Sequence, residues 1–521
     1  MKIILTILIM LMCTTNTQQA AAQATDSANA QIDFYATKFR DILKTIVENY
    51  DADVDIPALS DKCFNAMLGS LDPFSHYFTA ETWRQMTAEN RGTTVGVGLE
   101  FFRRGDSLVV IEVAPQSPAE SAGIKPGDKI LFIGGKSFLG KSSSEARAAL
   151  EGADSSKIEI IIKQTATEYL KSLTLTRHEF AVKSLGTHFI IPHSRTLYLK
   201  LLRFSGTSPD EIREAIRSYP RKKFDTLVID LKDNQGGALN SVIEICKDFT
   251  SLGDSILFTK AKNAEYRYDY INDREGEFSK IPLVVLVNSE SASASEIFAG
   301  VVQDLDRGQV VGENTLGKGL VQRSWNYTDT SAFRLTVAKY YTPSGRLIQK
   351  PYNVDTNEVI DPSLKLSMSP EAYEQLRQSV LAHGGMKNVP IYHTRSGRPV
   401  IALGGIRPDV SVASDSLTLL TETLKSRGLN LEFALDYIAA NPTASGSATH
   451  WATTFNFPDA VIADFIAFCN ARNCWNQEMY DRDKAIIAAN LKATIGYLLY
   501  GDSAYYAVLA LSDPQVRACL R

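Results

Sequence analysis

The sequence lacks an excess of basic residues, a second long apolar run and a cysteine framework. Its 55 lysines and arginines stand against 59 aspartates and glutamates, so the formal net charge is −4. A chain without a positive field is a poor candidate for binding nucleic acid. With 44% hydrophobic and 22% charged residues, its composition is that of a globular protein. Because a domain usually has roughly 100 to 200 residues, we expect several modules.

The one long apolar run lies at the N-terminus. An apolar run over residues 3–12, interrupted only by Thr6, follows a single lysine and precedes a stretch of small residues that ends in Ala22-Gln23-Ala24. This layout is typical of a cleaved secretory signal, and the run is shorter than the roughly 20 residues that span a bilayer. We therefore expect export to the periplasm, cleavage near Ala24, and a soluble mature chain without a transmembrane segment. Cys13 leaves a lipoprotein alternative open, but the bulky Met12 before it argues against lipidation.

The remaining cysteines are too scattered for a disulfide framework or a CxxC metal site. Five of them follow the signal: Cys63, Cys246, Cys469, Cys474 and Cys519. Cys469 and Cys474 could pair in an oxidising compartment, although isolated buried thiols are the simpler interpretation. We expect neither a metal nor an organic cofactor.

The residue composition and the spacing of apolar residues change along the chain and indicate four regions after the signal peptide of residues 1–24. Helical spacing of apolar residues marks a scaffold over residues 25–92. Short strands alternating with turns and two helices indicate a small α+β module over 93–178. Alternating strands and helices then predict an α/β core over 179–412, with residues 346–400 looping out. A helical region over 413–521 carries no recognisable motif, so its role stays open between scaffolding and assembly.

The small module contains a glycine turn, Gly96-Val97-Gly98-Leu99, and the stretch IKPGDKILFIGG. Successive backbone N–H groups in such a turn can bind a peptide's terminal carboxylate, while the neighbouring strand edge adds the peptide as another strand. The module resembles a PDZ domain. The alternative is that Gly96 and Gly98 only make a strand turn.

The stretch SESASASEIF at 289–298 follows a predicted buried strand and precedes a helix. Ser293 with Glu296 three positions later is typical of a capping box, which is a purely structural interpretation. A serine nucleophile needs a base that takes its proton, and that base is commonly histidine. None of the histidines falls in a loop at the expected carboxyl edge of the core sheet, so a Ser-His-Asp triad has no support.

Lys318, in the sequence Gly317-Lys318-Gly319, is the better candidate base. A lysine acts as a base only when neutral, which requires burial to lower its pKa from about 10.4. The surrounding GENTLGKG also approaches the phosphate-binding pattern GxxxxGK[ST]. However, Gly319 replaces the hydroxyl that holds magnesium, and a strand follows where a helix should.

Several stretches together resemble the carboxyl-terminal processing (tail-specific) protease family. They are LVIDLKDNQGGAL, the segment from LVVLVNSESASASEIF to GENTLGKGLVQ, TVAKYYTPSGRLIQ and GGIRPDV. The resemblance covers roughly residues 60 to 410. It implies an α/β multidomain fold with a crotonase-like (ββα superhelix) peptidase core, an inserted PDZ domain, and helical N- and C-terminal regions.

The resemblance also implies roles for individual residues. Ser293 is the family's nucleophile, Lys318 its general base, and Gln322 the side chain that orients the base. The oxyanion hole is formed by the backbone N–H groups of Ala294 and Gly237. Family members often have proline or a third glycine at the position of Gln235. Asp304 matches an acid of uncertain role, which could instead hold Arg307 or a neighbouring loop.

We therefore expect an exported serine endopeptidase that recognises apolar C-terminal tails and cleaves through an acyl-enzyme. Its partners would be protein substrates and an adaptor or lipoprotein activator. Two alternatives stay open. One is a catalytically inactive PDZ-type peptide-binding scaffold, and the other is a hydrolase of a non-peptide acyl substrate.

Overall fold

The computed structural model describes residues 27–165, 167–350, 390–402, 404–441 and 446–520. It divides into two compact units, which are Met1–Gly69 and Ser70–Arg521. The predicted signal peptide lies outside the described residues. In the described part of the chain, no helix is both long and apolar enough to cross a membrane.

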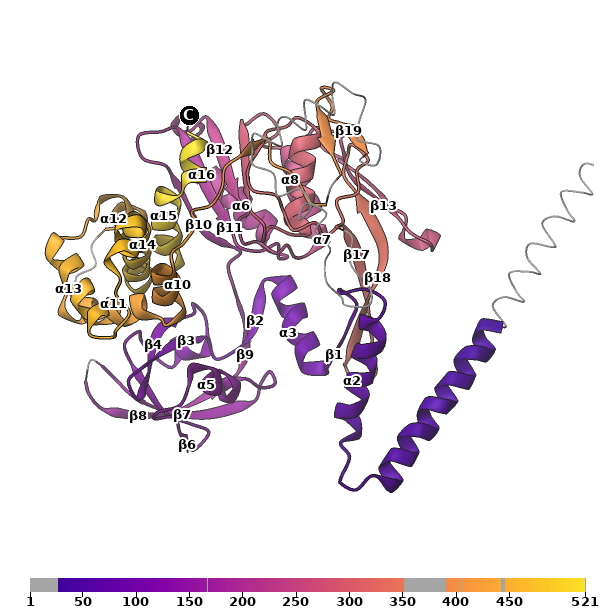
Figure 1. Ribbon diagram of the computed structural model, residues 1–521, viewed down its shortest axis with the longest axis horizontal. Coiled ribbons are helices and arrows are strands. Elements are labelled where there is room, and N and C mark those ends of the chain that lie inside the picture. The colour runs from indigo at the N-terminus through magenta and orange to yellow at the C-terminus, as the bar shows by residue number, and fades with distance from the viewer. Residues whose placement is uncertain (1–26, 166, 351–389, 403, 442–445, 521) are drawn as a thin grey trace, which may run out of the picture. The chain divides into compact units, whose positions relative to one another are not determined.

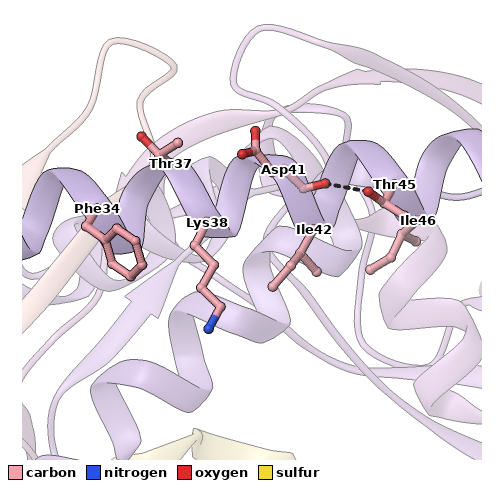
Figure 2. Close-up of a pocket in the computed structure, with 7 residues that line it drawn as sticks. All are labelled: Phe34, Thr37, Lys38, Asp41, Ile42, Thr45 and Ile46. Carbon is pink, nitrogen blue, oxygen red and sulfur yellow. Dashed lines mark hydrogen bonds between the residues drawn. The ribbon is translucent and has the colours of Figure 1, made fainter.

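The first unit consists of a helix over residues 27–49 and α2 (Ile56–Gly69). This confirms the helical pattern predicted here. One side of the first helix lines a pocket of about 470 Å³ (Figure 2), formed by Phe34, Thr37, Lys38, Asp41, Ile42, Thr45 and Ile46. The Thr45 hydroxyl donates to the Asp41 carbonyl oxygen at 2.8 Å. All these residues belong to one helix, so the pocket is a shallow groove along its surface.

The PDZ-like module is a small antiparallel sheet with two short helices. Its strand order is β3-β4-β5-β7-β8, and β6 (Lys136–Ser137) pairs with β5. The bounds are β3 (Leu99–Arg104), β4 (Ser107–Val113), β5 (Lys129–Ile133), β7 (Lys157–Lys163) and β8 (Leu170–Thr176), with α4 (Pro118–Ser121) and α5 (Ser143–Leu150). Before and after it, β2 (Thr93–Gly96) pairs with β9 (His178–Ala181). Strand β3 lies at the edge of the sheet.

The core is built on a sheet of six described strands in the order β10-β11-β12-β15-β16-β21. They are β10 (Leu185–Ile190), β11 (Thr196–Leu201), β12 (Thr226–Asp230), β15 (Leu283–Val287), β16 (Gln309–Gly312) and β21 (Val410–Ser411). β10 pairs antiparallel with β11, and the other strands are parallel. A parallel sheet covered on both faces needs apolar side chains on both. The strand TLVID meets that need, since Leu227 and Val228 belong to different apolar clusters.

Helices cover the two faces of this sheet. On one face lie α6 (Ser208–Arg217), α7 (Leu239–Phe249) and α8 (Ala294–Asp304), whose apolar residues join the cluster that contains Leu227 and Ile229. On the other face lie C-terminal helices, whose residues cluster with Val228 and Leu286. Figure 1 shows α15 and α16 running beside β10–β12. The region that carried no motif is therefore part of the core's packing.

The C-terminal region contains α10 (Leu419–Ser426), α11 (Leu429–Ala440), α12 (Ala448–Thr454), α13 (Asp459–Asn470), α14 (Gln477–Tyr500), α15 (Asp502–Ser512) and α16 (Pro514–Ala518). It also meets the PDZ-like module (Figure 1), because the Tyr497 hydroxyl donates to Glu112 of β4 and Arg104 of β3 pairs with Asp436. The five cysteines within the described residues are free thiols, and Cys474 donates to the Cys469 carbonyl oxygen at 3.2 Å.

A second, antiparallel sheet lies in the same unit. Its order is β1-β18-β13-β14, and β17 (Leu320–Asn326) also pairs with β18 (Ala332–Tyr341). The others are β1 (His76–Phe78), β13 (Ser255–Lys260) and β14 (Asp269–Ile271). The predicted insertion of 346–400 begins too early, because Ile348 is fully buried in the core cluster and Arg346 is 1% exposed. Residues 351–389 lie outside the described residues, and β19 (Ile391–His393) pairs with β20 (Pro399–Ile401).

Candidate active site

Three loops follow the carboxyl ends of neighbouring parallel strands. Residues 231–237 follow β12, residues 288–293 follow β15, and residues 313–319 follow β16. Carboxyl ends of parallel strands lie at one edge of a sheet, which is where ligands bind in such folds. The predicted oxyanion glycine, nucleophile and base lie on these three loops, one on each.

Ser293 occupies a strained backbone position immediately before α8. Its φ of 54° and ψ of −111° lie outside the regions that non-glycine residues ordinarily adopt. Strain of this kind costs roughly 1 to 3 kcal/mol and persists only where the surroundings hold it. The capping box that the sequence predicts is present, because the Glu296 carboxylate accepts the Ser293 N–H at 2.8 Å. Among the described hydrogen bonds none is donated by the Ser293 hydroxyl, so its proton is available to a base.

Glu296 holds the backbone of two of these loops. The side chain is fully buried, and its oxygens accept hydrogen bonds from Ser293 N at 2.8 Å, Lys318 N at 2.8 Å and Gly317 N at 2.7 Å. The Thr315 hydroxyl donates a further bond at 2.6 Å. Burial raises the pKa of Glu296 to about 7, although these donors oppose that rise. The sequence predicted only a helix cap here, and the bonds to residues 315–318 had no local signal.

Lys318 has the lowered pKa that a lysine base requires. Burial lowers the pKa of its ammonium group from 10.5 to about 8, the nearby Arg334 guanidinium adds to this, and Glu296 and Asp72 oppose it. The Lys318 Nζ lies 5.0 Å from the centre of the Phe74 ring. The Tyr340 hydroxyl contacts the carbonyl oxygens of both Lys318, at 2.7 Å, and Ser293, at 3.2 Å. Within the described residues, no hydrogen bond joins the Ser293 and Lys318 side chains.

Gln322 contacts Phe74, whose ring lies beside Lys318. Its Nε2 donates to the Phe74 carbonyl oxygen at 2.6 Å, at a point where the pairing of β17 with β18 shifts register. Among the described contacts it has no hydrogen bond to Lys318. In this structure Gln322 therefore holds Phe74, whose ring lies beside the lysine, and its role in orienting the base stays a prediction.

The two predicted oxyanion donors lie on adjacent loops. No acceptor for the N–H of Gly237 or of Ala294 is found among the described hydrogen bonds. Gly237 has φ of 146°, and a Cβ there would lie 2.0 Å from the Phe204 carbonyl oxygen. A Cβ on Gly236 would lie 2.9 Å from both the Ala294 nitrogen and the Ser293 Cβ. Only glycines allow this close approach of the two loops.

The serines that flank Ser293 bind the glycine loop. The Ser295 hydroxyl donates to the Asn234 carbonyl oxygen at 2.7 Å, and Ser291 donates to Leu231 at 2.8 Å. The Asn234 side chain in turn accepts from Gly236 N at 2.9 Å and donates to the Leu201 carbonyl oxygen at 3.0 Å. The alternation of serines in SASAS thus places Ser293 between two serines whose hydroxyls bind the loop of residues 231–237.

The glycine turn of the PDZ-like module also has free donors. No acceptor for the N–H groups of Val97 and Gly98 is found among the described hydrogen bonds, while their carbonyl oxygens bind Ala119 N and Ala114 N. Gly98 has φ of 79°, and a Cβ there would clash with Ser117. Gly96 ends β2, and Leu99 begins the edge strand β3.

Asp304 has a structural partner. It accepts from Arg346 at 2.6 Å and from Ser344 N at 3.0 Å, and both side chains of the ion pair are buried. Arg307 instead donates to backbone carbonyl oxygens, among them that of Phe249. In the part of the chain that the structure describes, no three His, Cys, Asp or Glu residues are grouped as metal ligands.

Comparison with known proteins agrees with this combination of sheet, loops and edge-strand module. Residues 195–360 match the model of peptidase family S41, and residues 109–164 match that of a PDZ domain. Residues 420–501 match a family of unknown function, DUF8443. The fold and the site thus define a multidomain α/β peptidase with a PDZ domain.

Named relatives narrow this class. The chain is 30% identical over 341 residues to the carboxy-terminal processing protease CtpB of Bacillus subtilis (strain 168), a match that covers 64% of this chain and 69% of that protein. It is 28% identical over 335 residues to a probable CtpA-like serine protease of Staphylococcus aureus (strain N315), covering 64% and 65%. The chain belongs to the carboxy-terminal processing proteases of peptidase family S41.

Among solved structures, the photosystem II D1 C-terminal processing protease is 28% identical, with a TM-score of 0.35. That match covers 59% of this chain and 82% of the other.

Proposed function

We propose that this protein is an exported serine endopeptidase that recognises the C-terminal tails of its substrates and cleaves them with a Ser293–Lys318 dyad. The observation that carries the proposal is the bridge through Glu296, which binds the backbone N–H groups of both residues at 2.8 Å. The bridge holds the loop of a strained serine next to the loop of a lysine whose pKa is lowered to about 8.

In the proposed reaction, Ser293 Oγ attacks the peptide carbonyl carbon while neutral Lys318 takes the hydroxyl proton. The N–H groups of Gly237 and Ala294 bind the oxyanion, and each such donor typically contributes about 2.7 to 4 kcal/mol. Lys318 then gives the proton to the leaving amine, which leaves an ester on Ser293. A water molecule, deprotonated by Lys318, attacks the ester carbonyl, and the proton returns to Ser293 as the acid product leaves.

The PDZ domain supplies the recognition step in this proposal. The N–H groups of Val97 and Gly98 would bind the terminal carboxylate of a substrate, and its last residues would pair with the edge strand β3. Apolar side chains at the tail would contact the module's apolar interior. An adaptor or a lipoprotein activator would act by delivering such tails or by shifting the PDZ domain.

Export to the periplasm is the remaining part of the proposal and rests on the sequence of residues 1–24. Cell fractionation and N-terminal sequencing of the mature protein test it. A mature chain that starts near residue 25 in the periplasmic fraction supports export. A chain that keeps Met1 and stays in the cytoplasm contradicts it.

The activity is tested with an unstructured protein substrate that ends in an apolar tail. Ser293→Ala and Lys318→Ala should each lower kcat by about a thousand-fold or more. The proposed nucleophile and its base act as one unit, so the loss of either side chain removes most of the catalytic effect. Ser289→Ala is the matched control, since this serine is exposed on the same loop. Equal cleavage by wild type and Ser293→Ala would exclude the assigned nucleophile. Tail binding without any cleavage by the wild type would instead identify an inactive scaffold.

A further inference from the structure

A cleft of about 320 Å³ adjoins Gly236 and Gly237. These glycines belong to the loop of residues 231–237, which contains a proposed oxyanion donor and is called the oxyanion loop below. It is bounded by three segments, namely the end of α3 (Ala80–Arg91), the residues that follow β11, and the oxyanion loop itself. The lining residues are Glu89, Asn90, Leu202, Arg203, Phe204, Asp233, Gln235, Gly236 and Gly237. A peptide whose carbonyl group lies at Gly237 therefore has part of its chain at or inside this cleft.

Arg203 is the unusual residue of this cleft. It is half-buried, and its guanidinium group has no hydrogen bond or ion pair among the described residues. Another partly buried arginine in the same unit, Arg213, is paired with Asp248 at 2.7 Å. A guanidinium group presents a planar set of donors that matches a carboxylate in bidentate geometry. An unpaired one beside the reacting loop is available to a ligand.

The neighbouring carboxylates do not satisfy Arg203. Asp233 is exposed, and its side chain already accepts a bond from Asn288 Nδ2 at 2.8 Å. Glu89 is exposed at the rim. Burial and Glu112 raise the pKa of the Asp502 carboxyl to about 6, and Arg203 only partly opposes this from beyond ion-pair distance. The exposed acids are solvated, whereas the half-buried cation gains most from a new partner.

We propose that this cleft is a substrate subsite in which Arg203 binds a carboxylate of the peptide chain close to the scissile bond. The inference rests on the proposed peptidase function and adds a preference within it. The carboxylate has two possible sources, the side chain of Asp or Glu and the free C-terminus of a short tail. Because Arg203 follows β11, the strand next to β12, the fold brings it to the same sheet edge as Gly237.

A peptide series tests this directly. One Asp, Asn or Lys is moved through the four positions on either side of the cleaved bond, in peptides with free and with amidated C-termini. The ratio of kcat/KM for Asp over Asn is measured for the wild type, for Arg203→Gln and for the exposed control Arg267→Gln. The same peptides are titrated into Ser293→Ala by fluorescence anisotropy, so the subsite is tested even if no peptide is cleaved.

At one position the wild type should prefer Asp by about 10-fold, as one charge-assisted hydrogen bond provides. Arg203→Gln should lower this ratio to near one, and Arg267→Gln should keep it. A ratio that survives in Arg203→Gln, or a preference for Lys, would overturn the proposal. A preference for Asp that persists in amidated peptides identifies the side chain as the source, whereas a fall in kcat/KM on amidation that occurs in the wild type and not in Arg203→Gln identifies the terminal carboxylate. If the wild type cleaves none of the peptides but Ser293→Ala still binds the Asp peptides more tightly than the Asn peptides, the proposed peptidase function is contradicted and the proposed subsite is supported.

Discussion

The carboxylate of Glu296 accepts the backbone N–H of Lys318 at 2.8 Å, across 22 residues of sequence. The same oxygen accepts Ser293 N at 2.8 Å. A buried carboxylate between two backbone donors fixes the positions of the loops without contacting the substrate itself. We therefore expect Glu296 to act as a positioning residue, because its charge and length set the separation of the proposed nucleophile and base.

Glu296→Gln should destabilise the protein by about 1 to 3 kcal/mol, because an amide group replaces one acceptor oxygen and leaves buried donors unpaired. It should also lower kcat by about 10- to 100-fold, since displacement of the reacting groups by about 1 Å has that effect. Urea unfolding and steady-state kinetics measure the two effects. Glu290→Gln is the control, because Glu290 is exposed on the same loop. Unchanged kinetics in Glu296→Gln would show that the bridge is dispensable.

Lys318→Met should abolish cleavage and yet stabilise the fold at pH 7. The folded protein holds Lys318 with a pKa of about 8 and the unfolded chain with one near 10.5, so the unfolded state binds more protons between these values. Wild-type stability therefore rises as pH increases from 8 towards 10.5. The free energy of unfolding of the variant should therefore exceed that of the wild type by up to about 3 kcal/mol, because each unit of pKa shift corresponds to about 1.36 kcal/mol. This difference should be largest below pH 8 and shrink above it. Urea unfolding at pH 7, 8, 9 and 10 checks this trend.

Arg334→Met should move the pH dependence of kcat/KM to higher pH. Arg334 lowers the pKa of Lys318 through charge repulsion, so its removal favours the protonated lysine and reduces the fraction of neutral base at pH 7. A pH–rate profile for wild type and variant gives the midpoint of the rising limb. Arg323→Met, an exposed arginine on β17, serves as the control. A midpoint that stays in place or falls would contradict the assignment of Lys318 as the titrating base.

Gly237→Ala should lower kcat by about 100- to 1,000-fold, the usual effect of losing an oxyanion donor. The added Cβ would lie 2.0 Å from the Phe204 carbonyl oxygen, so the loop must move. Gly253→Ala is the matched control, because Gly253 also has positive φ, at 86°, but has no heavy atom within 4 Å of the added Cβ. That control should cost about 1 to 3 kcal/mol in stability and leave kcat alone.

Asp513→Asn tests whether the C-terminal helices support the oxyanion loop. Asp513 pairs with Lys232, which is 9% exposed and begins that loop, while Asp230 is the second acid near Lys232 at 3.6 Å. Removal of one partner of a buried pair should destabilise the protein by up to about 3 to 5 kcal/mol, less here because Asp230 stays. A double-mutant cycle with Lys232→Met isolates the pair. A coupling energy near zero would show that the C-terminal helices do not stabilise the loop of residues 231–237 through this ion pair.

The sequence located the candidate site residues because its signals are local. Ser293, Lys318 and the glycines of NQGG lie in short motifs between predicted strands and helices, and the parallel strand order brings such loops to one edge. The helical scaffold, the small strand-rich module and the alternating core could be predicted from periodicity. The start of the insertion could not, because Ile348 and Arg346 are fixed by distant partners in the core, including Asp304.

The positions of side chains between elements needed the tertiary structure. Gln322 lies four residues from Lys318, but it donates to Phe74, which is 248 residues away. Arg203 has no motif at all, and only the folded chain places it in a cleft beside Gly237. The C-terminal helices carried no readable functional motif, and only the tertiary structure shows that they cover the second face of the core sheet.

The sequence by itself thus determined which residue types are available for acyl transfer and on which loops they lie, since local spacing encodes strands, turns and helix starts. Only the tertiary structure decided that Glu296 joins the loops of Ser293 and Lys318 and that burial lowers the pKa of the lysine. Both outcomes depend on the removal of water by segments far apart in the chain, and no local pattern of residues encodes that removal.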